Sequence, residues 1–181
     1  MDDMTEFQPY FEAVVGHEGG FTKNAKDSGN WTGGVIGKGT LKGTKYGIAA
    51  ASYPDEDIEG LTLDRARFLY FRDYWQRVGC DSLPPVLRYA VFDSAVNNGA
   101  GNAARFLQRA LGVADDGKIG PLTRAAIAKH PDPLALGAKF QTERATLHTK
   151  LSSWGDFGKG WCIRLAQIGF QSVRLGEQGQ S

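Results

Sequence analysis

The chain has 181 residues, 41% of them hydrophobic and 23% charged, a balance that predicts one medium or two small packed domains and excludes wholesale disorder. The formal net charge of +1 gives no indication of nucleic-acid binding, although residues 100–181 hold 11 Lys and Arg against 6 Asp and Glu. This basic half favours an anionic polymer or surface, and ordinary solvated helix faces account for it equally well.

Cysteine usage and the N-terminus indicate a cytosolic product. Cys80 and Cys162 are too few for a disulfide framework and lie in no cluster with metal-ligand spacing, so we expect buried or free thiols, no metal and no cofactor. The start "MDDMTEFQPY" is acidic and lacks the apolar core of a signal peptide. No stretch approaches the roughly 18 apolar residues that span a bilayer, so stable membrane insertion is not expected.

The first predicted helix begins between Thr5 and Gln8 and runs to Glu18, where Gly19 takes the left-handed conformation that ends a helix. Helical periodicity places Glu18 on the apolar face. A carboxyl group at the negative end of a helix dipole, directed into an apolar cleft, has a raised pKa, as a general acid requires. The alternative is a Glu18 paired with a lysine and a Gly19 that only stops the helix.

Residues 21–47 hold seven glycines and almost no helical period, which predicts loop plus a short β-hairpin. Asp27 lies nine positions after Glu18 and, on the return through this segment, can face it. Two carboxyl groups across a cleft are the working parts of most glycosidases, although Asp27 is equally typical of a turn. The hydroxyls of Thr32 and Thr44 can position a water, or both can be ordinary strand residues.

The rest of the chain is predicted to be almost entirely helical, with Pro84-Pro85 as the one candidate boundary. Asn97 and Asn98 stand at the end of a helix, where their amides suit hydrogen bonds to sugar hydroxyls or N-acetyl groups, and equally suit C-capping. Further helices are expected in five segments: from Thr62 or Asp64 to Gly79, from Asn102 to Gly112, after Pro121, after Pro133, and over Gly160–Leu175.

Several of these motifs occur together in an order that resembles a known family. "HEGGF", then Asp27, then "GTKYGIAAASYP", is similar to the bacterial and phage N-acetylmuramidases of glycoside hydrolase family 108. The second half, with "VFDSAVNNGAGNAARFLQRALG", "DGKIGPLT" and "GKGWCIRL", resembles the predicted peptidoglycan-binding region that accompanies them. The resemblance extends from about Tyr10 to Arg174.

The resemblance implies a mainly α, lysozyme-like helical fold with a small β-hairpin or flap beside the active-site cleft. It divides the chain into a catalytic lobe over residues 1–85, a helical and peptidoglycan-binding lobe over residues 86–176, packed as one globule, and a loose tail over 177–181. Glu18 matches the catalytic glutamate and Asp27 the acidic position after it. "NWTGGVIGKGTLKG" is extra length, so the third catalytic residue is Thr44 by motif and Thr32 by spacing from Asp27.

The implied activity is a lysozyme-type N-acetylmuramidase (EC 3.2.1.17) that cleaves the β-1,4 bond between N-acetylmuramic acid and N-acetylglucosamine, as a phage or prophage endolysin. The expected partner is the peptidoglycan glycan strand, with neither nucleic acid nor metal. We expect a monomer that is made in the host cytoplasm and reaches the periplasm and cell wall through a holin-type pore. Candidate substrate-binding residues are Trp31, Thr32, Tyr46, Asn97 and Asn98.

Three alternatives remain open at this point. A lytic transglycosylase uses one glutamate and no water, and the Asp27 partner argues against it. A non-catalytic wall-binding or secretion-associated protein would not depend on the acid of Glu18. A peptidase that cuts the stem peptide needs a metal or nucleophile cluster, which the sequence does not present.

Overall fold

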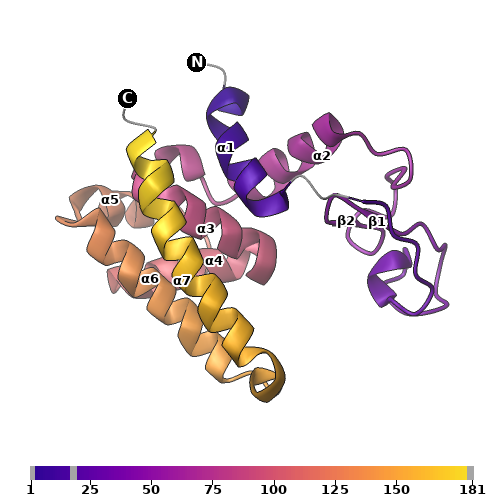
Figure 1. Ribbon diagram of the computed structural model, residues 1–181. Helices are drawn as coiled ribbons and strands as arrows, with labels where there is room; N and C mark the ends of the chain where they lie inside the picture. The colour runs from indigo at the N-terminus through magenta and orange to yellow at the C-terminus, as the bar shows by residue number, and fades with distance from the viewer. Residues whose placement is uncertain (1–2, 17–19, 179–181) are drawn as a thin grey trace. The chain divides into compact units, whose positions relative to one another are not determined.

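The computed structural model describes residues 3–16 and 20–178 and divides into two compact units. Residues 11–70 form one, named here the flap unit, and residues 1–10 with 71–181 form the other, named the helical unit. The described residues include seven α-helices and one two-stranded antiparallel sheet (Figure 1). The predicted mainly helical, lysozyme-like fold with a small β-hairpin is confirmed, while the predicted division at residue 85 stays a prediction.

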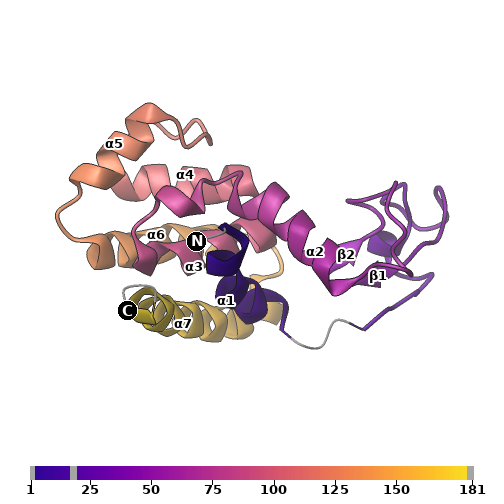
Figure 2. The same cartoon turned by 90° about the horizontal axis from the view of Figure 1, so that it is seen from above.

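The helical unit is organised around one central helix, α3 (Pro85–Asn98). Leu87, Val91, Phe92 and Ala95 of α3 are fully buried, because other helices cover it on several sides. In Figure 2, α4 and α7 run along opposite sides of α3. The remaining helices of the unit pack on these: α4 (Ala100–Leu111), α6 (Pro133–Thr149) and α7 (Trp154–Gln178) contact α3, and α5 (Pro121–Lys129) contacts α4.

An aromatic cluster anchors one end of this unit. The Phe7 ring lies 5.2 Å from both Trp75 and Phe92, measured between ring centroids, and 5.3 Å from Phe71. Trp75 is fully buried, and its indole Nε1 donates a hydrogen bond of 2.6 Å to Asp81. Such tilted and edge-on ring pairs each add about 0.5–1.5 kcal/mol beyond the burial of their area.

The first helix, α1 (Asp3–Val15), ends earlier than the sequence predicts. Gly16 has a φ of +68°, and its N–H bonds to the carbonyl oxygen of Glu12 at 2.9 Å, so the chain leaves the helix there. The predicted stop at Gly19 is therefore wrong, because an earlier glycine takes the left-handed position. Glu18 itself lies outside the described residues, three positions beyond the end of α1.

The predicted hairpin is present and very short: β1 (Thr44–Lys45) pairs antiparallel with β2 (Ile48–Ala49). Its two turn residues, Tyr46 and Gly47, both have positive φ, 51° and 74°, as a type I′ turn requires. A β-carbon at Gly47 would lie 2.3 Å from the Tyr70 hydroxyl, and this hydroxyl donates to the Tyr46 carbonyl oxygen at 3.1 Å. Tyr70 therefore supports the turn through this hydrogen bond and through its close approach to Gly47.

The long helix predicted to end at Gly79 is formed in two parts. α2 (Leu63–Tyr70) is followed directly by a π-helical turn, Phe71–Trp75, and Gly79 adopts the predicted left-handed conformation with a φ of 63°. Insertions of this kind shift the register of the buried side chains along a helix.

The two cysteines are not joined in a disulfide. Cys80 is buried, and burial raises the pKa of its thiol well above the usual value. Cys162 is exposed.

Other helix ends follow the sequence signals, with three exceptions. Pro121 and Pro133 open α5 and α6 as predicted. Asn102 lies inside α4, which begins at Ala100, so Asn102 is not its cap. α7 begins at Trp154, six residues before the predicted start, and continues through Glu177 and Gln178, which were predicted to be loose.

In the part of the chain that the structure describes, no helix has the length and apolar character needed to cross a bilayer.

Candidate active site

The glycine-rich segment of residues 20–47, called the flap from this point, is held together by a buried asparagine, Asn30, which the sequence alone did not single out. Asn30 is 1% exposed, and its Nδ2 donates to the Asn24 carbonyl oxygen at 3.1 Å. Its own carbonyl oxygen accepts from the N–H groups of Lys42 and Gly43 at 3.0 and 3.1 Å. Asn30 therefore joins the outgoing and returning arms of a segment that otherwise contains almost no regular structure.

Asp27 is exposed and caps the short 3-10 turn Ser28–Asn30. One carboxylate oxygen, Oδ1, accepts the Gly29 N–H at 2.9 Å, which fixes the direction of the side chain. The Asp27 backbone carbonyl accepts the Asn30 N–H at 3.2 Å. The turn-type interpretation of Asp27 is thus correct for its local structure, and the exposed carboxylate still has the capacity to accept hydrogen bonds from water or substrate.

Thr44 is connected to the same asparagine through its side chain. Its Oγ1 lies 2.9 Å from Asn30 Oδ1, and since the Asn30 amide nitrogen is used by Asn24, the threonine hydroxyl must be the donor. The Thr44 oxygen then keeps lone pairs that can accept a hydrogen bond from a water molecule. Its backbone exchanges two hydrogen bonds of 2.8 Å with Thr22 across an antiparallel bridge.

Thr32 has a different connection. Its Oγ1 accepts the Thr40 N–H at 2.9 Å, and the Thr32 N–H donates to the Thr40 carbonyl oxygen at 3.0 Å. Both bonds close the base of the glycine-rich insertion. Asn30 thus links Thr44 to Asp27, whereas Thr32 stabilises the inserted loop, and this geometry favours Thr44 as the water-positioning residue.

The two threonines can be separated by mutation. We expect Thr44→Val to lower kcat by about 10²-fold with little change in KM, because the water loses its acceptor, while Thr44→Ser restores most of the activity. Thr32→Val, the matched control, should keep kcat within about threefold, since it affects only the loop. Steady-state kinetics on soluble glycan strands measure this; a larger kcat loss in Thr32→Val than in Thr44→Val would assign the role to Thr32.

The two aromatic candidates in the flap are held in different ways. The half-buried Trp31 donates from its indole Nε1 to the Ala25 carbonyl oxygen at 3.0 Å, which fixes its ring. Tyr46 is the one non-glycine residue with positive φ in the described part of the chain, and the Lys45 ammonium lies 5.6 Å from its ring centroid. A backbone conformation of this kind costs about 1–2 kcal/mol, so the fold spends stability to place Tyr46 at the hairpin turn.

The last two candidates, Asn97 and Asn98, belong to the helical unit. Asn97 donates from Nδ2 to the Asp93 carbonyl oxygen at 2.8 Å. Asn98 Oδ1 accepts from Ser94 Oγ at 3.2 Å and from Arg144 Nε at 2.9 Å, and Asn98 Nδ2 lies 3.4 Å from His148 Nε2. Both amides therefore make intramolecular hydrogen bonds, and a role in sugar binding stays a prediction.

Asn98 is part of a buried ionic cluster that sequence reasoning missed. Asp93 is fully buried in α3, with Arg144 Nη2 at 2.7 Å from one carboxylate oxygen and Arg164 Nη2 at 2.5 Å from the other. Arg144 is only 1% exposed, and burial lowers the pKa of its guanidinium. Burial, helped by the Arg144 charge, also lowers the pKa of His148. The sequence feature that could have indicated this buried cluster is Asp93 itself, a charged residue within the otherwise apolar run "YAVFDSAV".

Within residues 3–16 and 20–178, no group of three or more His, Cys, Asp or Glu side chains is arranged to hold a metal ion. The chemistry available in the flap is that of a carboxylate, a hydroxyl and aromatic faces.

Comparison with known proteins connects these features to a family. The family model described as glycosyl hydrolase 108 matches residues 11–99, a range that contains all eight predicted site residues, Glu18 included. A second model, described as a predicted peptidoglycan domain, matches residues 102–166. Among curated proteins no relative matches.

A solved structure is similar over nearly the whole chain. The structure of Brucella abortus SagA has a TM-score of 0.75 and 26% sequence identity, and the match covers 96% of this chain and 95% of that chain. The likeness therefore includes both the glycine-rich flap and the helical unit. The chain therefore joins a region that matches glycosyl hydrolase family 108, residues 11–99, to a region that matches the predicted peptidoglycan domain, residues 102–166, and these two matches support a glycoside hydrolase that acts on peptidoglycan.

Proposed function

We propose that the protein is an N-acetylmuramidase that hydrolyses the β-1,4 bond between N-acetylmuramic acid and N-acetylglucosamine. The observation that carries this proposal is the family match over residues 11–99, which includes Glu18 and Asp27, the two carboxyl groups that a glycosidase needs. Glu18 donates a proton to the departing glycosidic oxygen. Asp27 stabilises the positive charge that develops on the sugar ring or orients the attacking water.

The flap geometry supports a hydrolytic rather than a non-hydrolytic reaction. Asp27 presents an exposed carboxylate, and the Thr44 oxygen, with its hydrogen committed to Asn30, can accept a hydrogen from water. Both groups are attached to the same buried residue, so their spacing depends on it. A lytic transglycosylase needs neither group. The stereochemical outcome follows from the separation of the two carboxyl groups, roughly 5–5.5 Å for retention and 6.5–9.5 Å for inversion.

The charge of the flap suits an anionic wall polymer. Residues 20–47 hold five lysines and a single aspartate, Asp27. Peptidoglycan carries carboxylates on its stem peptides, so a cationic flap attracts the strand while Asp27 is the lone negative group in it. Trp31 and Tyr46 offer faces on which sugar rings can stack.

Product identity tests the bond specificity. Digestion of purified sacculi is expected to release fragments with N-acetylmuramic acid at the new reducing end, identified by borohydride reduction and mass spectrometry. N-acetylglucosamine at the new reducing end would contradict a muramidase. New amino groups without new reducing ends would indicate a peptidase.

We further propose an endolysin role, in a phage or prophage setting. The substrate lies outside the inner membrane, so the protein acts in the periplasm or cell wall, as a monomer, after passage through a holin-type pore. Expression in a bacterial host with and without a co-expressed holin tests this route. Lysis that is equally fast without the holin would contradict it.

A further inference from the structure

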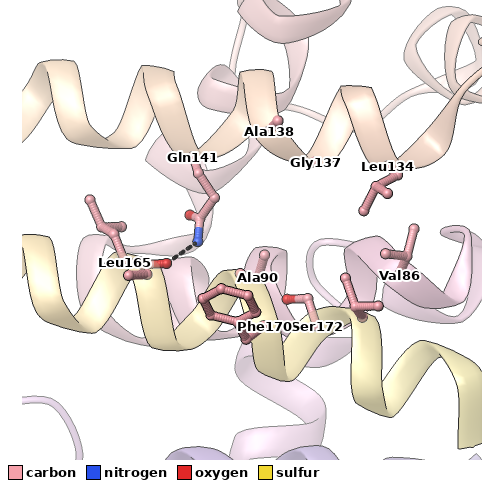
Figure 3. Close-up of a pocket in the computed structure, with 12 residues that line it drawn as sticks. Val86, Ala90, Leu134, Gly137, Ala138, Gln141, Leu165, Phe170 and Ser172 are labelled. Atoms are coloured by element: carbon pink, nitrogen blue, oxygen red, sulfur yellow. Dashed lines mark hydrogen bonds between the residues drawn. The ribbon is translucent and has the colours of Figure 1, made fainter.

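A groove of about 360 Å³ lies between α6 and α7 in the helical unit, with α3 also contributing to its wall (Figure 3). Its lining includes small residues from both helices: Gly137 and Ala138 from α6, and Ala166 and Gly169 from α7. Phe170, 81% exposed, lies at its edge. The volume falls at the lower end of the range for small-ligand sites, which suits one small residue and its adjoining peptide group.

Two polar atoms inside this groove have no hydrogen-bond partner. The Ser172 side chain is 4% exposed, and its hydroxyl is unpaired. Gln141 donates from Nε2 to the Leu165 carbonyl oxygen at 3.3 Å and leaves its Oε1 buried and unpaired. In Figure 3 both side chains point into the space between α6 and α7. Buried polar groups are normally satisfied, so an unpaired pair that lines an open groove is available to hydrogen-bond a ligand.

We propose that this groove binds an alanyl residue of the peptidoglycan stem peptide together with its adjoining peptide group, an inference that rests on the proposed function. Such a residue offers a methyl group for the small apolar walls, an amide N–H for Gln141 Oε1 and a carbonyl oxygen for the Ser172 hydroxyl. All twelve residues that line the groove are uncharged, as an uncharged part of the ligand requires. Six of them lie within the predicted peptidoglycan domain.

Two other occupants fit less well. A sugar ring would lose the hydrogen bonds of its hydroxyls against a lining in which Ser172 and Gln141 are the only polar side chains. A second copy of the chain needs an interface of roughly 800 Å² and about 20–30 residues on each partner, whereas twelve residues line the groove. The alanyl peptide uses every feature of the groove.

Filling the groove tests the proposal. Titration calorimetry of the full chain with a synthetic stem tetrapeptide (L-Ala, γ-D-Glu, meso-diaminopimelate, D-Ala) is expected to show binding, and Ala166→Trp to abolish it. Ala125→Trp, the same change at an exposed site on α5, should bind like the wild type. Ser172→Ala is expected to weaken binding about three- to tenfold by loss of one hydrogen bond. It serves as the second variant should Ala166→Trp fail to fold by circular dichroism.

Clear outcomes would overturn the proposal. These are no binding of the tetrapeptide to the wild type at millimolar concentration, undiminished binding to a folded Ala166→Trp variant, or undiminished binding to Ser172→Ala. Loss of chitotetraose binding in Ala166→Trp, with peptide binding kept, would assign the groove to the glycan instead. Hydrolysis of peptide-free glycan strands is measured in parallel: if it is absent while the tetrapeptide binds in an Ala166-dependent way, the muramidase proposal fails and the groove assignment stands.

Discussion

Replacing Glu18 by Gln is expected to lower the hydrolysis of glycan strands by about 10³-fold, with KM nearly unchanged. The amide keeps the size and hydrogen-bonding capacity of the side chain, and it has no proton of suitable acidity for the glycosidic oxygen. The measurement is the rate of reducing-end formation on purified sacculi at several pH values. The residual rate should also lose the alkaline limb of the pH profile, on which a general acid is ionised.

A matched variant separates the loss of the catalytic acid from a non-specific effect of replacing a glutamate by glutamine. Glu12→Gln makes the same chemical change at an exposed position on α1, and it should retain wild-type activity within about twofold. Full lytic activity in Glu18→Gln would remove Glu18 from the role of acid. It would then favour the non-catalytic, wall-binding alternative for the protein.

The second large effect is on stability: Arg144→Met is expected to lower the free energy of unfolding by about 3–5 kcal/mol. Asp93 and Arg144 are 0% and 1% exposed, and the variant leaves the buried carboxylate with Arg164 alone. It also removes the donor to Asn98 Oδ1. Urea denaturation followed by circular dichroism measures the change.

Arg164→Met provides the comparison, because it removes the other partner of the same carboxylate. The Arg164 side chain is 45% exposed, so its loss should destabilise by about 1 kcal/mol. Asp93→Leu combined with Arg144→Met should recover part of the loss, since an apolar pair leaves no buried charge unmatched. A larger destabilisation from Arg164→Met than from Arg144→Met would contradict the assigned burial of this cluster.

The fold class was predictable because its signals are local and repeated. Pro121, Pro133 and Gly112 mark helix ends that the structure reproduces, since a proline at the first turn and a left-handed glycine act within a few residues. The hairpin was predictable in kind and is placed by Tyr46 and Gly47, the two turn positions with positive φ. These features need no knowledge of tertiary packing.

The end of α1 shows where local rules stop. The sequence offers glycines at 16, 19 and 20, and each can end a helix. Periodicity favoured the later ones because Glu18 continues the apolar face, whereas the structure ends the helix at Val15 with Gly16 left-handed. α1 therefore ends three positions before Glu18, and its dipole gives no reason to expect a raised pKa at that position.

The parts of the site that were missed depend on long-range pairing. In the sequence, Asn30 is one more turn residue in "KDSGN". Its structural role depends on the hydrogen bonds that it accepts from Lys42, Gly43 and Thr44, which lie 12 to 14 positions later in the chain. Asp93 pairs with residues 51 and 71 positions later in the chain, a relation that sequence spacing cannot supply. Thr44 and Thr32 likewise differ only through long-range partners, because Thr44 donates to Asn30 whereas Thr32 accepts from the Thr40 N–H group.

The most direct test of the central claim is the fate of water in the reaction. Peptide-free glycan strands are digested by the wild-type protein in isotopically labelled water, and the products are analysed by mass spectrometry. We expect one labelled oxygen at the new reducing carbon of N-acetylmuramic acid, and about 10³-fold slower formation of this product with Glu18→Gln. Unlabelled 1,6-anhydro ends from the wild type would contradict it and assign the protein to the lytic transglycosylases.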